Sequence, residues 1–217
     1  MSTPFGPPSG EIRVGRVGGA EVAFLARHGP AHSVPPHRLN HRANLWALQD
    51  LGVRRVVGTS SVGALKTGIR PGTIVVPDDY LCLWDLPTFY DDKVVHVTPG
   101  LDAGMRKAIA RAAKREGAVV RERGVYAQTR GPRLETKAEI RLLADYADVV
   151  GMTMASEATL AAELQIPYAS LCTVDNYAHG VSEQPLTYEA IMRTQKKNAA
   201  LVTRLLGPVI RALLRGA

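Results

Sequence analysis

The chain has few cysteines and no long apolar run. Its two cysteines, Cys82 and Cys172, lie far apart and do not form a metal-binding spacing. No stretch of apolar residues is long enough to span a bilayer. Residues 1–10 lack the basic and apolar pattern of a secretory signal. We therefore expect a cytoplasmic protein with reduced cysteines.

The net charge of +7 reflects basic residues that are scattered along the chain. Many fall on two predicted amphipathic helices, residues 102–117 and 187–214, whose other faces are apolar. This pattern is typical of a solvated outer face. No zinc-finger spacing or aromatic RNA-binding signature is present. A nucleic-acid binder, which would need a strongly salt-dependent affinity for polyanions, is therefore a distant alternative. A small anion such as phosphate would benefit from the positive field.

The length of 217 residues favours one domain, residues 1–217, in which residues 1–10 form an extended N-terminus. Predicted strands alternate with predicted helices, which indicates an α/β fold. The expected strands are 11–16, 21–26, 54–59, 72–77, 118–126, 149–150 and 166–174. The expected helices are 39–51, 102–117, 135–146, 155–164 and 187–214, the last either continuous or broken near Gly207. Residues 78–100 form a long irregular segment, typical of a functional loop or an interface.

The stretch from Val149 to Glu157 joins a short strand to a helix through Gly151. A glycine lets a ligand approach the backbone, the Thr153 hydroxyl can donate, and helix amides can face an anion. Met152 offers a soft apolar surface for a sugar or a ring. An ordinary turn with a buried methionine is the alternative.

Polar side chains follow four of the predicted strands. These are Arg27 and His28, Ser60 and Ser61 in a small-residue turn, Met152 and Thr153, and Asp175 and Asn176 in a loop. If the strands are adjacent, their ends converge on one crevice, where open α/β sheets bind ligands. The Arg27 guanidinium suits an oxyanion, and the serine and threonine hydroxyls add neutral donors. We expect no metal site, because His32, His37 and His41 are expected at solvated loop and helix positions.

Three long motifs carry a family resemblance. They are Leu25–His32 followed by Pro35-Pro-His and Asn44–Leu48; Gly131–Glu139; and Gly151-Met-Thr with Glu157 and the small-residue helix after it. Over about residues 3 to 206 the chain resembles the trimeric purine nucleoside phosphorylases, in the methylthioadenosine and methylthioinosine phosphorylase branch. The resemblance implies a central mixed sheet flanked by helices. It also implies a homotrimer with active sites at subunit interfaces.

These enzymes cleave a purine nucleoside with inorganic phosphate as co-substrate, without a metal or other cofactor. The resemblance implies that phosphate is bound by five residues: Arg27, His28, Ser60, Ser61 and Thr153. It places Met152 beneath the ribose, His32 near the sugar or phosphate, and Val62, Gly63 and Leu134 near the base. At the 5′ end it implies His96 from a neighbouring subunit, with Tyr177 and His179 where the 5′ group is selected.

Base preference rests on two positions. By resemblance, Glu135 holds N1 and the 6-oxo group, and Asn176 binds N7. A carboxylate accepts from N1–H, which hypoxanthine and guanine have and neutral adenine lacks. A one-residue shift of the alignment would place Asp175 at N7, as in adenine-specific relatives. The sequence favours a 6-oxopurine nucleoside or its 5′-methylthio form, 5′-methylthioinosine, with 5′-methylthioadenosine as the alternative.

The chain departs from the family at its start, where relatives have a strand and a glycine-rich phosphate loop. Three explanations are open: a longer natural protein, a nucleoside hydrolase that uses water, or a purine-binding homologue without catalysis. Ser156 also replaces a proline that is usual before Glu157.

Overall fold

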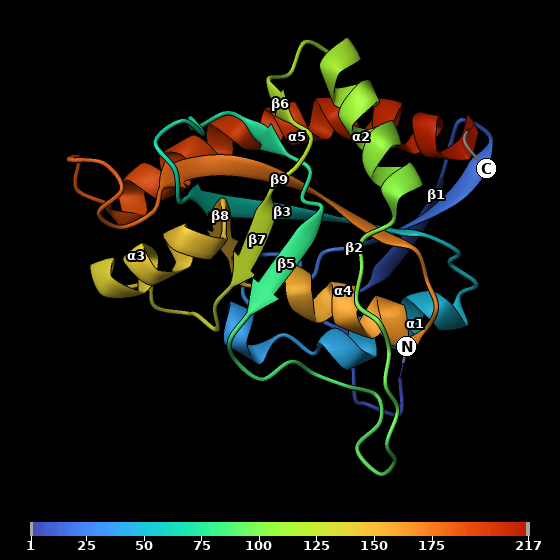
Figure 1. Ribbon diagram of the computed structural model, residues 1–217. Coiled ribbons are helices and arrows are strands. Elements are labelled where there is room, and N and C mark those ends of the chain that lie inside the picture. Colours follow the sequence, from blue (N-terminus) through green and yellow to red (C-terminus); the bar gives the residue numbers. More distant parts are fainter. Residues whose placement is uncertain (1, 216–217) are drawn as a thin grey trace.

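The computed structural model describes residues 2–215 and contains a mixed sheet of seven strands (Figure 1). Their order is β5-β7-β8-β3-β9-β4-β6. The strands are β3 (Val56–Ala64), β4 (Ile74–Val75), β5 (Asp79–Cys82), β6 (Val120–Arg121), β7 (Val125–Gln128), β8 (Val149–Gly151) and β9 (Tyr168–Tyr177). A separate antiparallel hairpin pairs β1 (Ile12–Val17) with β2 (Ala20–Leu25), as the sequence predicts. The expected fold class is confirmed.

Helices cover both faces of the sheet (Figure 1). On one face lie α2 (Ala103–Arg115) and α5 (Tyr188–Arg215), and on the other lie α1 (His41–Asp50) and α4 (Met154–Glu163). The helix α3 (Lys137–Tyr146) lies beside β8, and a short 3-10 helix spans Pro36–Arg38. Each face has its own apolar core, so β3 and β9 are buried between two layers. No helix within residues 2–215 is long and apolar enough to cross a membrane.

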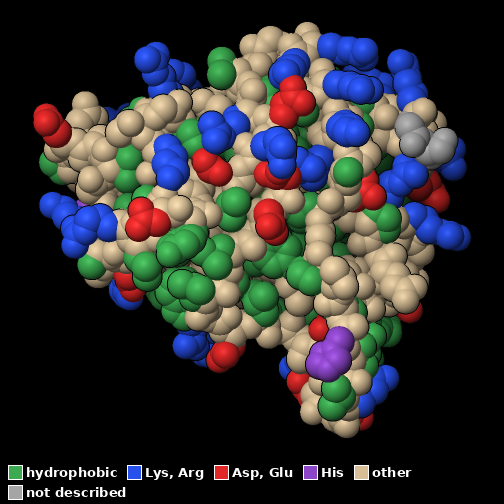
Figure 2. Space-filling model, in the orientation of Figure 1, with side chains coloured by type: hydrophobic (Ala, Val, Ile, Leu, Met, Phe, Trp, Pro, Cys, Tyr) green, Lys and Arg blue, Asp and Glu red, His purple; other side chains and the backbone are tan. Residues whose placement is uncertain are grey.

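The basic residues of α2 lie mostly on its exposed side, for example Lys107 and Arg111. Figure 2 shows Lys and Arg side chains over the α2 and α5 region, whereas hydrophobic side chains gather lower on this face. The buried side of α2 carries Met105 and Ile109 instead. The expected solvated outer face of this helix is therefore confirmed.

Several predicted boundaries are wrong because strand pairing extends beyond the local pattern. The long parallel pairing of β3 with β9 continues through Ala64 and Tyr177, so residues 60–64 are strand rather than turn. Residues 118–126 contain two short strands, and β5 lies within the segment expected to be irregular. The last helix is continuous through Pro208, the first of the two expected alternatives, and Leu205 and Val209 beside it are fully buried.

Candidate active site

Arg27 follows β2 and projects its guanidinium into the domain, where the side chain is only 14% exposed. Its Nη1 donates to Thr153 Oγ1 at 2.7 Å, and its Nη2 donates to the Thr59 carbonyl at 2.9 Å. Its Nε lies 2.9 Å from Glu157 Oε1. A guanidinium has five N–H groups, so within the described chain one remains on each terminal nitrogen. Two such N–H groups suit one oxyanion.

Glu157 completes this arrangement and was assigned no role from the sequence. It is buried, and its second carboxylate oxygen accepts a hydrogen bond from Tyr168 Oη at 2.7 Å. Burial alone would lower the pKa of Arg27, but Glu157 together with Tyr168, Tyr126 and Cys172 opposes it, so the pKa of Arg27 is raised. Gly58 leaves room for this contact, since a Cβ there would lie 2.1 Å from Tyr168 Oη.

The hydroxyl of Thr153 lies next to the guanidinium. Thr153 Oγ1 accepts from Arg27, which leaves its proton available to another acceptor. Ser60 directly follows Thr59, and its buried Oγ has no hydrogen-bond partner within residues 2–215. A buried hydroxyl without a partner is uncommon and calls for an explanation. Ser60 lies on the same face of β3 as Gly58, which abuts Glu157, so we assign Ser60 with Arg27 and Thr153 to a candidate anion site.

Two histidines flank this site on the loop after Arg27. His28 Nδ1 donates to the Val34 carbonyl at 2.9 Å, and the ring stacks on His32 with centroids 4.4 Å apart. Burial lowers the pKa of His28. The hydrogen bond orients the His28 ring, and the exposed His32 ring stacks on it.

The expectation that backbone amides of α4 face an anion is wrong. The amides of Thr153 and Met154 point to Tyr126 Oη, at 3.2 and 3.5 Å. The amide of Ser156 donates to Gln128 Oε1 at 3.1 Å. Side chains from β7 therefore cap this helix and occupy three of its first amides.

Ser60 and Ser61 do not face the same site, contrary to the expectation that one crevice receives both. Because β3 continues through them, their side chains point to opposite faces of the sheet. Ser61 donates to the Asp175 carboxylate, which also accepts from Asn198 Nδ2 at 2.6 Å. Ser61 thus belongs to a polar cluster on the α5 face, away from Arg27.

The polar residues do not all lie at converging strand ends, contrary to expectation. Although β3 and β9 are parallel, β8 runs antiparallel to β3, with Gly63 opposite Val150. Thr153 therefore lies along β3 rather than beyond its end. Arg27 follows β2, a strand of the separate hairpin. The two still meet, at 2.7 Å.

The end of β9 contains a bulge that separates the roles of Asp175 and Asn176. Val62 pairs with Val174, but Gly63 pairs with Asn176, so Asp175 is the additional residue. Asp175 is 2% exposed, and burial raises its pKa. Asn176 is half-buried beside Gly63, where a Cβ would lie 3.2 Å from Asn176 Nδ2.

Glu135 lies before α3 and is buried, with Oε1 accepting from Thr129 Oγ1 at 2.5 Å. His179 Nδ1 donates to the backbone carbonyl of Glu135 at 3.0 Å, so the segment after β9 contacts the main chain at this residue. Leu134 is exposed beside it. Tyr177 lies within β9, where its hydroxyl donates to the Thr67 carbonyl at 3.2 Å.

Two other predicted residues lie elsewhere. Val62 is 2% exposed and packs in the apolar core, so its side chain does not line a cavity. His96 is exposed on the loop between β5 and α2 and lines neither of the cavities described next.

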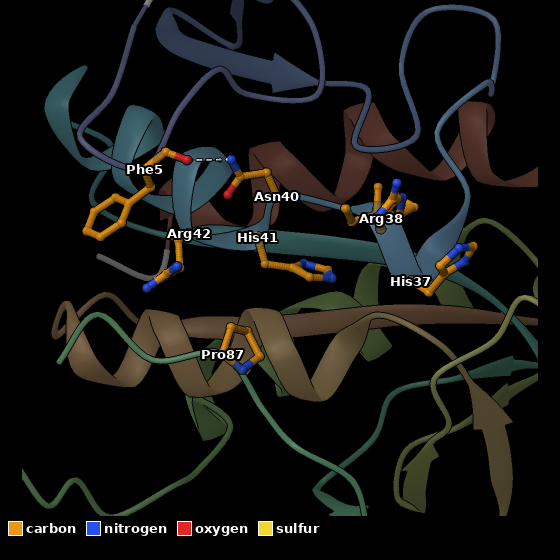
Figure 3. A pocket seen from close by; sticks show the side chains of 8 residues that line it. Phe5, His37, Arg38, Asn40, His41, Arg42 and Pro87 are labelled. Atoms are coloured by element: carbon orange, nitrogen blue, oxygen red, sulfur yellow. Dashed lines mark hydrogen bonds between the residues drawn. The ribbon is translucent and has the colours of Figure 1, made fainter. Parts of the chain in front are cut away.

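A cavity of about 390 Å³ has Met152, Thr129, Ser156, His41 and Trp84 among its lining residues. Met152 packs against Gly131, where a Cβ would lie 2.6 Å from the methionine Sδ. A second cavity of about 510 Å³ shares His41 and is lined by Phe5 and Arg42 (Figure 3). Within the described residues no three metal-ligating side chains cluster. His41 is buried, so its expected solvated position is wrong.

Comparisons with known proteins agree with this architecture. The family model described as "Phosphorylase superfamily" matches residues 1–211. The chain belongs to the phosphorylase superfamily. The resemblance found in the sequence is therefore confirmed.

Among the relatives, the probable 6-oxopurine nucleoside phosphorylase of Archaeoglobus fulgidus is 48% identical over 200 residues, covering 92% of this chain and 82% of the relative. The probable S-methyl-5′-thioinosine phosphorylase of Methanothermobacter thermautotrophicus is 45% identical over 205 residues, covering 91% and 71%. A solved adenosine/methylthioadenosine phosphorylase variant from Schistosoma mansoni, in complex with adenine, has a TM-score of 0.92 at 29% identity, covering 100% of this chain and 86% of that one.

Proposed function

We propose that this enzyme catalyses phosphorolysis of a 6-oxopurine nucleoside, giving the free base and a ribose 1-phosphate. The names of the relatives support the reaction class. The observation that carries the proposal is the anion site, in which Arg27 offers two N–H groups beside the hydroxyl of Thr153. Inorganic phosphate is the anion that this chemistry requires, and no other cofactor is needed.

The reaction needs charge stabilisation more than a protein nucleophile. As the glycosidic bond breaks, the sugar gains oxocarbenium character and the purine leaves with negative charge. Phosphate held by Arg27, Ser60 and Thr153 stabilises the cation and then attacks it. Fixed donors that need no reorganisation are effective in such a step. A donor from Asn176 to N7 would stabilise the departing base.

The base subsite favours a 6-oxopurine over adenine. Asp175, the residue that would favour adenine, is held by Ser61 and Asn198 within a buried cluster. Asn176 is the partly exposed neighbour, and its Nδ2 has a second N–H besides the one donated to the Tyr177 carbonyl at 2.8 Å. Glu135 supplies a buried acceptor for N1–H. The 5′ substituent is a hydroxyl or a methylthio group.

The remaining parts of the proposal concern assembly and location. We propose a cytoplasmic homotrimer, in which His96 of one subunit reaches the 5′ end of a nucleoside bound to its neighbour. The exposure of His96 on a long loop supports this role. Size measurement in solution tests the trimer, and His96→Ala should then alter the KM of the nucleoside without changing the KM of phosphate.

Release of base from inosine, 5′-methylthioinosine and 5′-methylthioadenosine, each with and without phosphate, tests the reaction. Release that requires phosphate, and is faster from the two 6-oxopurine nucleosides, is expected. Release without phosphate would mean a hydrolase. Thermal stabilisation by purines without any release would mean a binding protein.

A further inference from the structure

The end of β9 carries a polar cluster to which the proposed reaction assigns no direct role. It joins Ser61 of β3, Asp175 of β9 and Asn198 of α5. Ser61 Oγ donates to Asp175 Oδ2, and Asn198 Nδ2 donates to Asp175 Oδ1 at 2.6 Å. Within residues 2–215 no ion pair joins Asp175 to a basic side chain. A buried carboxylate held only by neutral groups costs folding free energy, which calls for an explanation.

The cluster lies at the bulge of β9. Val62 pairs with Val174, whereas Gly63 pairs with Asn176, so Asp175 is the additional residue. In a regular ladder Asp175 would lie opposite Gly63 instead. The bulge therefore decides whether an amide or a carboxylate takes that place. Bulges next to active sites commonly redirect a side chain in this way.

Hydrogen bonds hold the chain on both sides of the bulge. Asn198 Nδ2 donates to the Val174 carbonyl at 3.2 Å as well as to Asp175, so one amide group contacts two successive residues of β9. The helix that carries it, α5, packs along β9 (Figure 1). After the bulge, the amide of Ala178 donates to the Ala64 carbonyl at 2.9 Å. Asp175 is thus the point at which β3, β9 and α5 are joined.

Asn176 is the side chain that the bulge places opposite Gly63. It is half-buried, and a Cβ on Gly63 would lie only 3.2 Å from its Nδ2. One N–H of Nδ2 donates to the Tyr177 carbonyl at 2.8 Å, and the amide group has a second N–H. Because hydrogen bonds weaken steeply with distance and angle, a small shift of the bulge would misplace this donor.

We infer that Asp175 is a positioning residue, which Ser61 and Asn198 hold in place so that Asn176 donates to N7 of the purine. The inference rests on the proposed function, in which Asn176 is the donor to the departing base. Asp175 itself does not touch the substrate. Loss of its carboxylate should therefore weaken recognition of N7 and leave phosphate binding unchanged.

A pair of free bases tests this role without requiring turnover. Hypoxanthine and 7-deazahypoxanthine, which has a C–H group in place of N7, are compared by calorimetry in the presence of phosphate. The natural enzyme should bind hypoxanthine about 10-fold more tightly. Asn176→Ala is the reference and should lower this ratio of Kd values to about 1. Asp175→Ala should lower it to about 2 while the Kd of phosphate stays unchanged.

Two further variants separate positioning from general stability. In Asp175→Asn the Ser61 hydroxyl can rotate to accept from the new amide, so the ratio should remain about 5 or more. Ser170→Ala is the matched control, because Ser170 is also buried on β9 but donates to the Gly58 carbonyl at 3.2 Å, before the bulge. It should lower the Tm and keep the natural ratio. An equal loss of the ratio in Ser170→Ala and Asp175→Ala would overturn the inference.

Ser61→Ala decides the question if Asp175→Ala does not fold, because it removes one donor and keeps the carboxylate. Its ratio should fall to about 5 or less. A ratio that keeps its natural value in Ser61→Ala would overturn the inference. Equal binding of the two bases by the natural enzyme would overturn the contact of Asn176 with N7, and the inference with it. Failure of the natural enzyme to release hypoxanthine from inosine would instead overturn the proposed function, and the binding ratios would still decide the role of Asp175.

Discussion

The Nε of Arg27 lies 2.9 Å from Oε1 of Glu157, in an ion pair whose side chains are 14% and 8% exposed. This pair orients the guanidinium so that its terminal nitrogens face Thr153 and Thr59. A carboxylate that carried no role in the sequence analysis therefore determines how the anion site is presented.

Glu157→Gln tests this positioning. The substitution leaves a buried guanidinium without a compensating charge, and breaking such a pair costs about 3–5 kcal/mol of folding free energy. The Tm should fall, and in the folded enzyme the KM of phosphate should rise about 10-fold with a smaller change in the KM of inosine. Denaturation curves and initial rates measure both effects.

Glu163→Gln is the control for this variant, because Glu163 also lies on α4 but binds the loop residues Thr88 and Phe89. It should reduce stability without a specific effect on phosphate. An equal rise of the phosphate KM in both variants would show that a general loss of stability in α4 causes the effect, rather than loss of the ion pair with Arg27.

Ser60→Ala and Ser61→Ala should have opposite effects. Ser60 Oγ has no partner, so its removal should leave the Tm of the phosphate-free enzyme unchanged or slightly higher. The KM of phosphate should rise about 5- to 10-fold, because the variant loses one hydrogen bond to phosphate that contributes about 1 kcal/mol. Ser61→Ala removes a donor to buried Asp175 and should destabilise the fold by about 1–3 kcal/mol with little effect on phosphate. The reverse pattern would exclude Ser60 from the anion site.

Glu135→Ala tests recognition of the base. Loss of a charged acceptor for N1–H should lower kcat/KM for inosine about 10- to 100-fold, since hydrogen bonds to charged groups contribute about 1.5–3 kcal/mol. Activity with 5′-methylthioadenosine, which lacks N1–H, should fall much less. Glu139→Ala is the control, because Glu139 belongs to the capping box of α3. A similar loss with both nucleosides would count against the assignment of Glu135.

The buried carboxyl group of Asp175 should make the stability of the fold depend on pH. Burial raises the pKa of its carboxyl in the folded protein. The folded state therefore holds this proton more tightly than the unfolded state. The contribution of Asp175 to stability is fully present below the pKa of the unfolded state. It is lost as the pH rises through the pKa of the folded state. Asp175→Asn should flatten the decline of the Tm between acidic and neutral pH. A decline of unchanged slope would mean that other groups cause it.

The sequence predicts the elements better than it predicts which side chains meet. Arg27 and Thr153 could be placed at one site because each follows a strand. Ser61 could not be separated from Ser60, because the length of β3 depends on its pairing with β9, which local sequence does not specify. Glu157, Tyr168 and Tyr126 contact the site only through the packing of α4 on the sheet, so no short motif reveals their partners. The burial of His41 could not be predicted, because residues distant in sequence such as Pro87 line the same space.

The central claim is that phosphate, bound at Arg27, becomes attached to the sugar. Incubation of the enzyme with inosine and inorganic phosphate, followed by ³¹P NMR, tests it most directly. A new resonance of ribose 1-phosphate should appear in step with free hypoxanthine and should be strongly reduced in Arg27→Lys, which loses the paired N–H groups. Hypoxanthine without any ribose 1-phosphate would contradict phosphorolysis.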